Sequence, residues 1–196
     1  AAALIAAARA LAPTLRDRAA DTENLRRLPD ETVADLKAAG LFRALQPERC
    51  GGWQMDFHAH LDLVAEIAAG CGSTGWCLGV FQVHSWVAGL LSEQAQDDIY
   101  GDNPDALLAA VLNARGTALP SDDGYVVEGF WPFGSGSEHA DWMILGARIV
   151  GDNDDTLDEG CFLIPASDID IRDDWHVAGL RGTGSFHFET EQQFVP

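Results

Sequence analysis

The sequence predicts an α+β protein in which a helical domain precedes an antiparallel β domain. Before residue 113 the apolar residues recur at helical spacings of three and four, and after it they alternate with a period of two. Gly, Asp and Ser separate the periodic segments in both halves. Helices followed by a run of strands are typical of an α+β fold. We place the helical domain at residues 1–105 and the β domain at residues 106–196.

Three helices are expected before residue 71. Residues 1–8 are apolar and lead into a charged segment, so they are interpreted as the start of an amphipathic helix and not as a signal peptide. Asp30 is expected to cap a helix that ends at Gly40. A further helix is expected at 57–69, closed by Gly70. Leu61, Val64 and Ala68 lie on one apolar stripe of this helix.

A long apolar helix is expected to follow, from a cap at Ser73 or Thr74 to Leu91. Ser92 is then expected to begin a short helix that ends near Tyr100. The apolar stripe predicted for the long helix is Trp76, Val80, Val83, Val87 and Leu91.

Four strands are predicted in the second half, at 125–130, 142–150, 161–164 and 186–189. The acidic segment 151–155 between two of them is expected to be a turn. It is not a calcium-binding loop of the EF-hand type, because Leu157 and Leu163 occupy the positions where that loop requires Gly and Glu.

Composition argues against several functions. The 31 acidic and 12 basic residues give a net charge of −19, which disfavours binding to nucleic acid or to an anionic membrane. No apolar run approaches the roughly 20 residues that span a bilayer. The four cysteines lack metal-binding spacing and are expected to be buried free thiols. His58 and His60 diverge on a helix, so no metal site is expected.

Two glycine-rich segments are candidates for ligand binding. They are residues 129–136, GFWPFGSG, and residues 179–185, GLRGTGS. The second resembles a dinucleotide-binding loop, but that loop requires a helix after it, and 186–189 alternates like a strand. Glycines beside hydroxyl and aromatic residues allow the backbone to approach a flat ring such as a flavin, although a β-turn explains the glycines equally well.

Several motifs in order along the chain resemble one known family. They are GSTGW at 72–76, VHSW at 83–86, LNARGTA at 112–118, WPFGSG at 131–136, HADW at 139–142, GLRGTGS at 179–185 and FVP at 194–196. Together they resemble the oxygenase component of two-component, reduced-flavin-dependent monooxygenases of the aromatic hydroxylase type, in the acyl-CoA dehydrogenase-like superfamily. The resemblance implies a barrel-like β domain that binds flavin at its edge. Members continue into a four-helix bundle, which is missing after Pro196.

The resemblance also implies roles for residues of the β domain. Ser135 corresponds to the hydroxyl beside the reactive edge of the flavin, where it acts in catalysis and binds the cofactor. Phe133 corresponds to an aromatic residue that covers the flavin ring, and Asn113 and Ser185 lie on segments of the flavin pocket. A neutral hydroxyl such as that of Ser135 can form a hydrogen bond to a flavin oxygen adduct without adding charge.

In the helical domain, Trp76 and His84 correspond to residues that close over the substrate ring. Eight residues separate them, so they lie within about 80° of each other around a helix and can face one cavity. His84 is the second catalytic candidate, because an imidazole can bond a substrate hydroxyl and favour the phenolate.

The implied reaction is hydroxylation of an aromatic or phenolic substrate by O2 through a flavin C4a-hydroperoxide. The implied cofactor is reduced FMN, with FAD possible, supplied by a separate flavin reductase. The resemblance further implies a cytoplasmic homotetramer.

Two alternatives stay open. One is an FAD-dependent acyl-CoA dehydrogenase, although residues 113–118 read NARGTA where dehydrogenases have a Thr-Glu-Pro type of segment. The other is a truncated, non-catalytic homologue that acts as an interaction module.

Overall fold

The structure is a computed structural model that describes residues 1–151, 153 and 155–196. Its contacts divide the chain into two compact units. The helical unit comprises residues 1–107 and 176–184, and the β unit comprises residues 108–175 and 185–196. Residues 176–184 were predicted to belong to the β domain, whereas the structure groups this segment with the helices.

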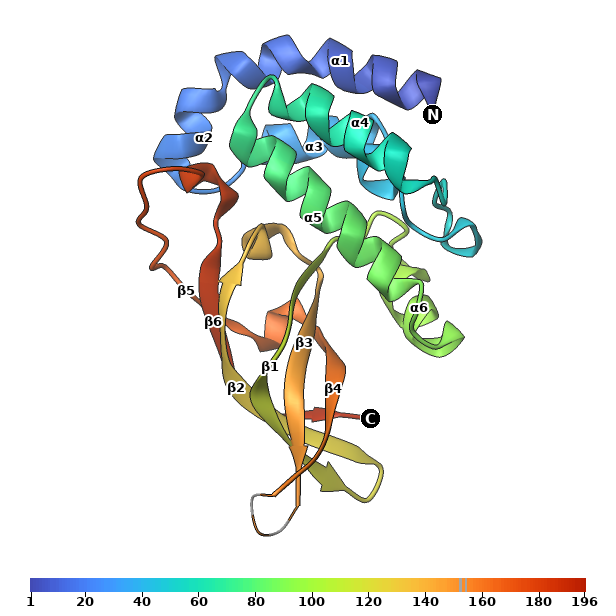
Figure 1. Ribbon diagram of the computed structural model, residues 1–196, viewed down its shortest axis with the longest axis vertical. Coiled ribbons are helices and arrows are strands. Elements are labelled where there is room, and N and C mark those ends of the chain that lie inside the picture. The colour runs from blue at the N-terminus through green and yellow to red at the C-terminus, as the bar shows by residue number, and fades with distance from the viewer. Residues whose placement is uncertain (152, 154) are drawn as a thin grey trace. The chain divides into compact units, whose positions relative to one another are not determined.

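In the helical unit, α4 packs against α1 on one side and against α5 on the other (Figure 1). Leu15, Leu36, Leu63 and Phe81 belong to its hydrophobic core, where each is almost fully buried. The helices are α1 (Ala2–Asp17), α2 (Ala19–Leu25), α3 (Asp30–Ala38), α4 (Phe57–Ala68), α5 (Gly72–Ala88) and α6 (Glu93–Tyr100), with short 3-10 turns at Leu41–Arg43, Glu48–Cys50 and Arg181–Thr183.

The predicted helix starts are partly correct. Ser92 caps α6 as expected, because its hydroxyl accepts a hydrogen bond from the amide of Ala95 at 3.2 Å. Asp30 is instead the first residue of α3 and follows the capping position. α5 begins at Gly72, so Ser73 and Thr74 lie inside its first turn and do not cap it.

The apolar stripes predicted on α4 and α5 do not form the core. Leu61 is 62% exposed and Trp76 is 50% exposed. Both helices are apolar over most of their circumference, so spacing alone does not identify the face that meets the core. The buried face of α4 carries Ala59, His60, Leu63 and Ile67, and that of α5 carries Cys77, Leu78, Phe81, Gln82, Ser85 and Ala88.

The β unit is one six-stranded sheet in the order β4-β3-β1-β2-β6-β5 (Figure 1). β1 and β3 are parallel, and the other neighbours are antiparallel. β4 also contacts β6, which is not its hydrogen-bonded neighbour, so the sheet curls towards a barrel. The strands are β1 (Leu108–Ser121), β2 (Gly124–Gly134), β3 (Trp142–Val150), β4 (Thr156–Pro165), β5 (Asp170–Arg172) and β6 (Phe186–Val195).

All four predicted strands are present as β2, β3, β4 and β6, whereas β1 and β5 were not predicted. The predicted turn at 151–155 includes Asp152 and Asp154, which lie outside the described residues. β6 follows the segment GLRGTGS directly, and this confirms that the segment does not lead into a helix.

Trp131 is the centre of the core of the β unit. It is fully buried, and its indole nitrogen donates to the carbonyl of Gly146 at 2.8 Å. A side chain at Gly116 or Gly129 would collide with the Trp131 ring. Gly134 similarly leaves room for the ring of Phe188. The glycines at 129 and 134 therefore accommodate core aromatics of the protein itself.

Glu23 attaches the segment 176–184 to the helical unit. Its carboxylate accepts hydrogen bonds from the Ser73 hydroxyl at 2.6 Å, the Arg181 amide at 3.1 Å and the Gly182 amide at 3.3 Å. Gly182 lies against Thr22, where a side chain would collide with the backbone. Partial burial raises the pKa of Glu23, but the three hydrogen bonds outweigh this effect, so the pKa lies below its usual value.

Three of the four cysteines match the expectation of buried free thiols. Cys161 is free but exposed, on the edge strand β4. Within residues 1–151, 153 and 155–196, no helix has the length and apolar character that crossing a bilayer requires.

We predict that Glu23→Gln lowers the free energy of unfolding by about 1 kcal/mol at neutral pH, because the amide offers one acceptor oxygen where the carboxylate offers two. The depressed pKa means that the stabilisation is present above the unfolded-state pKa and is lost as pH falls through the folded-state pKa. Urea unfolding of both proteins should therefore show a difference that shrinks below about pH 4. Glu31→Gln, at an exposed site on α3, is the control. A difference that stays constant with pH would contradict the role of Glu23.

Candidate functional site

Helices α4 and α5 border a groove, called here the helical groove. Its volume is about 280 Å³, close to the lower end of the range for small-molecule sites. Trp76 and His84, the two substrate-binding candidates, both line it. The complete lining is His60, Val64, Gly75, Trp76, Gly79, Val80, Val83 and His84.

Two glycines of α5 shape this groove. A Cβ on Gly75 would lie 2.5 Å from the Cβ of Ala68, so only glycine allows α5 to approach α4 this closely. A Cβ on Gly79 would lie 3.4 Å from Val64 and 3.9 Å from His60, which is ordinary contact. Gly75 therefore sets the spacing of the two helices, and Gly79 leaves the space between them open.

A chain of buried polar groups runs beneath the groove. The Gln82 side-chain nitrogen donates to the carbonyl of Leu41 at 2.6 Å, and the Gln82 side-chain oxygen lies 2.6 Å from Nδ1 of His60. Gln82 is fully buried and His60 is 7% exposed. These hydrogen bonds satisfy the buried amide and hold the imidazole in one orientation at the groove wall.

In the β unit, the structure brings together two of the residues expected to bind flavin. The hydroxyls of Ser135 and Ser185 are 2.7 Å apart, although fifty positions separate them in the sequence. Ser135 follows the end of β2, and Ser185 immediately precedes β6. Ser185 is 4% exposed, whereas Ser135 is only partly buried. Two adjacent hydroxyls can donate to and accept from a heteroaromatic ring edge.

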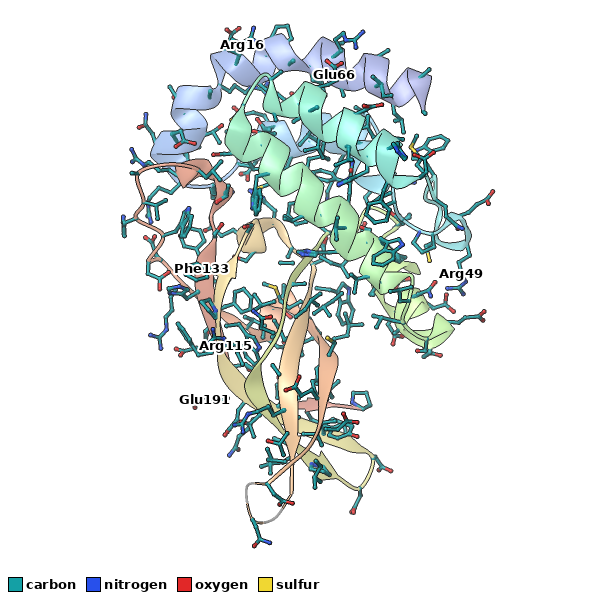
Figure 2. The ribbon with its side chains drawn as sticks, in the orientation of Figure 1. Arg16, Arg49, Glu66, Arg115, Phe133 and Glu191 are labelled. Carbon is teal, nitrogen blue, oxygen red and sulfur yellow. The ribbon has the colours of Figure 1, made fainter. Side chains whose placement is uncertain are left out.

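Phe133 lies two residues before Ser135 in an unusual conformation. Its φ is +69°, in the left-handed region that disfavours side chains other than glycine and costs on the order of 1 kcal/mol. Phe133 is labelled beside β2 and β6 in Figure 2. The residue is 63% exposed, and its ring centroid lies 6.2 Å from that of Trp175 and 5.3 Å from that of His187. A strained backbone that presents an aromatic ring to solvent is typical of a ligand-binding site.

His187 is in turn held by Asp174. Its Nδ1 lies 2.7 Å from one carboxylate oxygen of Asp174, and its backbone amide donates to the other oxygen at 3.2 Å. The His187 ring also contacts the ring of Phe130. The guanidinium carbon of Arg172 lies over the other aromatic ring of this pair, 5.4 Å from the centroid of Phe130. The exposed ring of Phe133 thus belongs to an ordered aromatic cluster on the β unit.

Asn113 is not brought into this arrangement by any contact among the described residues. It is exposed on β1, in the irregular stretch between Val111 and Gly116 where the register with β3 shifts. No group of three or more His, Cys, Asp or Glu suited to a metal ion occurs in the part of the chain that the structure describes.

Sequence reasoning missed His60, Trp175, His187 and Asp174. The sequence does contain a signal for His60. Gly75 and Gly79 indicate that α5 packs closely against another helix, and His60 lies one helical turn before Val64 on a single face of α4. For the aromatic cluster no local signal exists, since β5, on which Arg172 lies, is three residues long and its pairing with β6 is set by the tertiary fold.

Comparison with known proteins gives consistent matches. Residues 2–99 match the family described as acyl-CoA dehydrogenase, N-terminal domain. The oxygenase subunit HsaA of a flavin-dependent monooxygenase from Rhodococcus jostii (strain RHA1) is 44% identical over 187 residues, which cover 95% of this chain and 49% of that protein. A second relative is the oxygenase component of the FADH2-dependent resorcinol hydroxylase from Rhizobium sp. (strain MTP-10005). It is 36% identical over an alignment that covers 95% of this chain and 46% of that protein.

A solved structure agrees with these relatives. XiaF from Streptomyces sp., in complex with FADH2 and glycerol, matches with a TM-score of 0.96 at 33% identity, over 100% of this chain and 49% of that chain. The chain therefore spans about half the length of the relatives it matches. The expected fold, an acyl-CoA dehydrogenase-like helical domain followed by a β domain, is confirmed. The chain belongs to the acyl-CoA dehydrogenase family through its N-terminal domain, and within that family it is similar to the oxygenase components of flavin-dependent monooxygenases.

Proposed function

We propose that the protein is the oxygenase component of a two-component monooxygenase that uses reduced flavin and O2 to hydroxylate an aromatic substrate. One observation carries this proposal: the hydroxyls of Ser135 and Ser185 are paired, and Ser135 lies two residues after the strained, exposed Phe133. This is a suitable set for a flavin, because a planar heteroaromatic ring needs hydrogen-bonding groups at its edge and an apolar face. The named relatives support the same chemistry.

The residues of the β unit would hold the cofactor. Phe133 would cover one face of the flavin ring. Ser135 and Ser185 would form hydrogen bonds to the edge of the ring. Because both hydroxyls are neutral, they would add no charge there. When bound, the reduced flavin supplies the activated oxygen. Asn113, at the shift in β1, stays a candidate for the pocket.

The helical groove would bind the substrate. Its lining is mostly apolar, with the indole of Trp76 and the imidazole of His84 as the groups suited to an aromatic alcohol. His84 would accept the proton of a substrate hydroxyl in a hydrogen bond, which increases the electron density of the ring. The groove carries neither Lys nor Arg among its lining residues, so an anionic acyl-CoA is a poorer match than a neutral ring.

The remaining components follow from the proposed reaction. The family resemblance implies reduced FMN, and two relatives are named with the reduced form of FAD, so both flavins are candidates. The flavin would reach the oxygenase from a separate reductase. A homotetramer and a cytoplasmic location belong to the same proposal.

Ser135→Ala tests the role of the hydroxyl pair. We predict that the variant, in the full-length protein supplied with reduced flavin, O2 and a phenol, releases more hydrogen peroxide per hydroxylated product. Loss of one hydrogen bond of about 1.4 kcal/mol corresponds to a roughly tenfold change in this ratio. Product and peroxide are quantified in the same reaction. Ser121→Ala, at the exposed end of β1, should behave like the parent. Equal coupling in Ser135→Ala and the parent would contradict the role of Ser135.

Gly79→Ala tests the helical groove. The added methyl group fits in ordinary contact with Val64, so the fold is retained, and replacing a helical glycine should raise stability by up to about 1 kcal/mol. The same methyl group narrows the groove, so the affinity for phenols should fall by about tenfold. Calorimetric titration and thermal unfolding measure the two effects. Gly179→Ala is the control, because nothing lies within 4 Å of its added Cβ. Unchanged affinity for phenols in a stabilised Gly79→Ala would exclude the groove as the substrate site.

A further inference from the structure

His60 is a buried histidine that the proposed reaction does not use. It lies on α4, where its neighbour His58 is exposed, and it forms part of the wall of the helical groove. A polar ring that is 7% exposed on an otherwise apolar wall must have a fixed set of hydrogen bonds. Those bonds determine which nitrogen carries its proton.

The orientation of the Gln82 amide is fixed first. Its nitrogen lies 2.6 Å from the carbonyl oxygen of Leu41, and a carbonyl can only accept. The amide oxygen of Gln82 therefore points to the other side, where it meets Nδ1 of His60 at 2.6 Å. Because an amide oxygen can only accept, Nδ1 must carry the hydrogen.

This assignment leaves the other nitrogen of His60 as an acceptor. In a neutral imidazole with hydrogen on Nδ1, the Nε2 atom has a lone pair and no hydrogen. The Cε1 atom, which is bonded to both ring nitrogens, faces α5, since it would be 3.9 Å from a Cβ on Gly79. Within the described residues, no hydrogen-bond donor reaches Nε2.

The groove thus offers an oriented acceptor on α4, in addition to His84 on α5. Trp76, Val64, Val80 and Val83 line the same groove with apolar surface. A ligand that places a hydroxyl at Nε2 forms a hydrogen bond, whereas one that lacks the hydroxyl leaves the acceptor without water or partner. A buried site of this kind discriminates strongly between the two.

We propose that His60 is a binding residue of the helical groove that accepts a hydrogen bond from a hydroxyl of an aromatic ligand through Nε2. The class of ligand in this inference rests on the proposed function. The inference adds a residue on α4 that binds the ligand hydroxyl to the two candidates on α5, Trp76 and His84. Gln82 acts as its positioning residue, because it fixes the tautomer and the ring orientation.

The test measures the affinity of two ligands for the parent protein and for two variants, all full length and without flavin or O2. The ligands are resorcinol and phenol, which differ by one hydroxyl, and the variants are His60→Phe and His58→Phe. His60→Phe keeps a ring of similar breadth but has no acceptor. We expect the parent and His58→Phe to bind resorcinol about tenfold more tightly than phenol, and His60→Phe to lose this preference. An equal loss of affinity for both ligands in His60→Phe would show a structural role only and would overturn the proposal.

A second measurement covers the case in which His60→Phe does not fold. Nitrogen-15 NMR of the unmodified protein should show His60 as the tautomer with hydrogen on Nδ1, and resorcinol should shift its Nε2 resonance. A proton on Nε2, or an Nε2 resonance that does not respond to saturating resorcinol, would overturn the proposal. Hydroxylation is assayed separately with reduced flavin, so hydroxyl-selective binding without turnover would reject the proposed function and leave the role of His60 intact.

Discussion

The close packing of α4 against α5 is the constraint on which the helical groove depends. Gly75 lies so near to Ala68 that any side chain would force the helices apart. With the spacing fixed, Gly79 leaves a hollow where a larger residue would fill the space, and Trp76 and His84 line it. The same packing buries Gln82 beneath the groove, so that its amide can hold His60. Two glycines one helical turn apart therefore create the space of the groove. The close packing that they allow also places Gln82 where it can orient His60.

Periodicity in the sequence predicts the elements well but not the direction they face. The helices at α4 and α6 and the strands β2, β3, β4 and β6 follow from local patterns. The apolar stripes predicted on α4 and α5 do not form the core, because both helices are apolar on two faces and only tertiary packing decides which face meets the core. Part of these stripes lines the groove instead, through Val64, Trp76, Val80 and Val83. A helix with a second apolar face has a surface available for an apolar ligand.

Contacts between distant parts of the chain explain the remaining differences. Glu23 binds amides 158 and 159 positions away, and no local pattern indicates that the segment 176–184 packs on helices. β5 has only three residues and exists through its pairing with β6. The glycines of the WPFGSG segment illustrate the limits of motif reasoning, because Gly134 makes room for Phe188 while Phe133 carries the strain that sequence alone would assign to a glycine. The pairing of Ser135 with Ser185 joins two residues that the family resemblance had indicated separately.

Each unit carries one candidate binding surface. The β unit presents hydroxyls and an exposed aromatic ring suited to a flavin, and the helical unit presents an apolar groove with imidazoles suited to a phenol. The most direct test of the central claim is to supply the full-length protein with reduced flavin, a phenol and oxygen-18 gas, and to weigh the product by mass spectrometry. A reduced-flavin oxygenase inserts one labelled atom into the ring and reduces the other to water. A phenol recovered without label, together with oxidation of an acyl-CoA by an electron acceptor, would contradict the account.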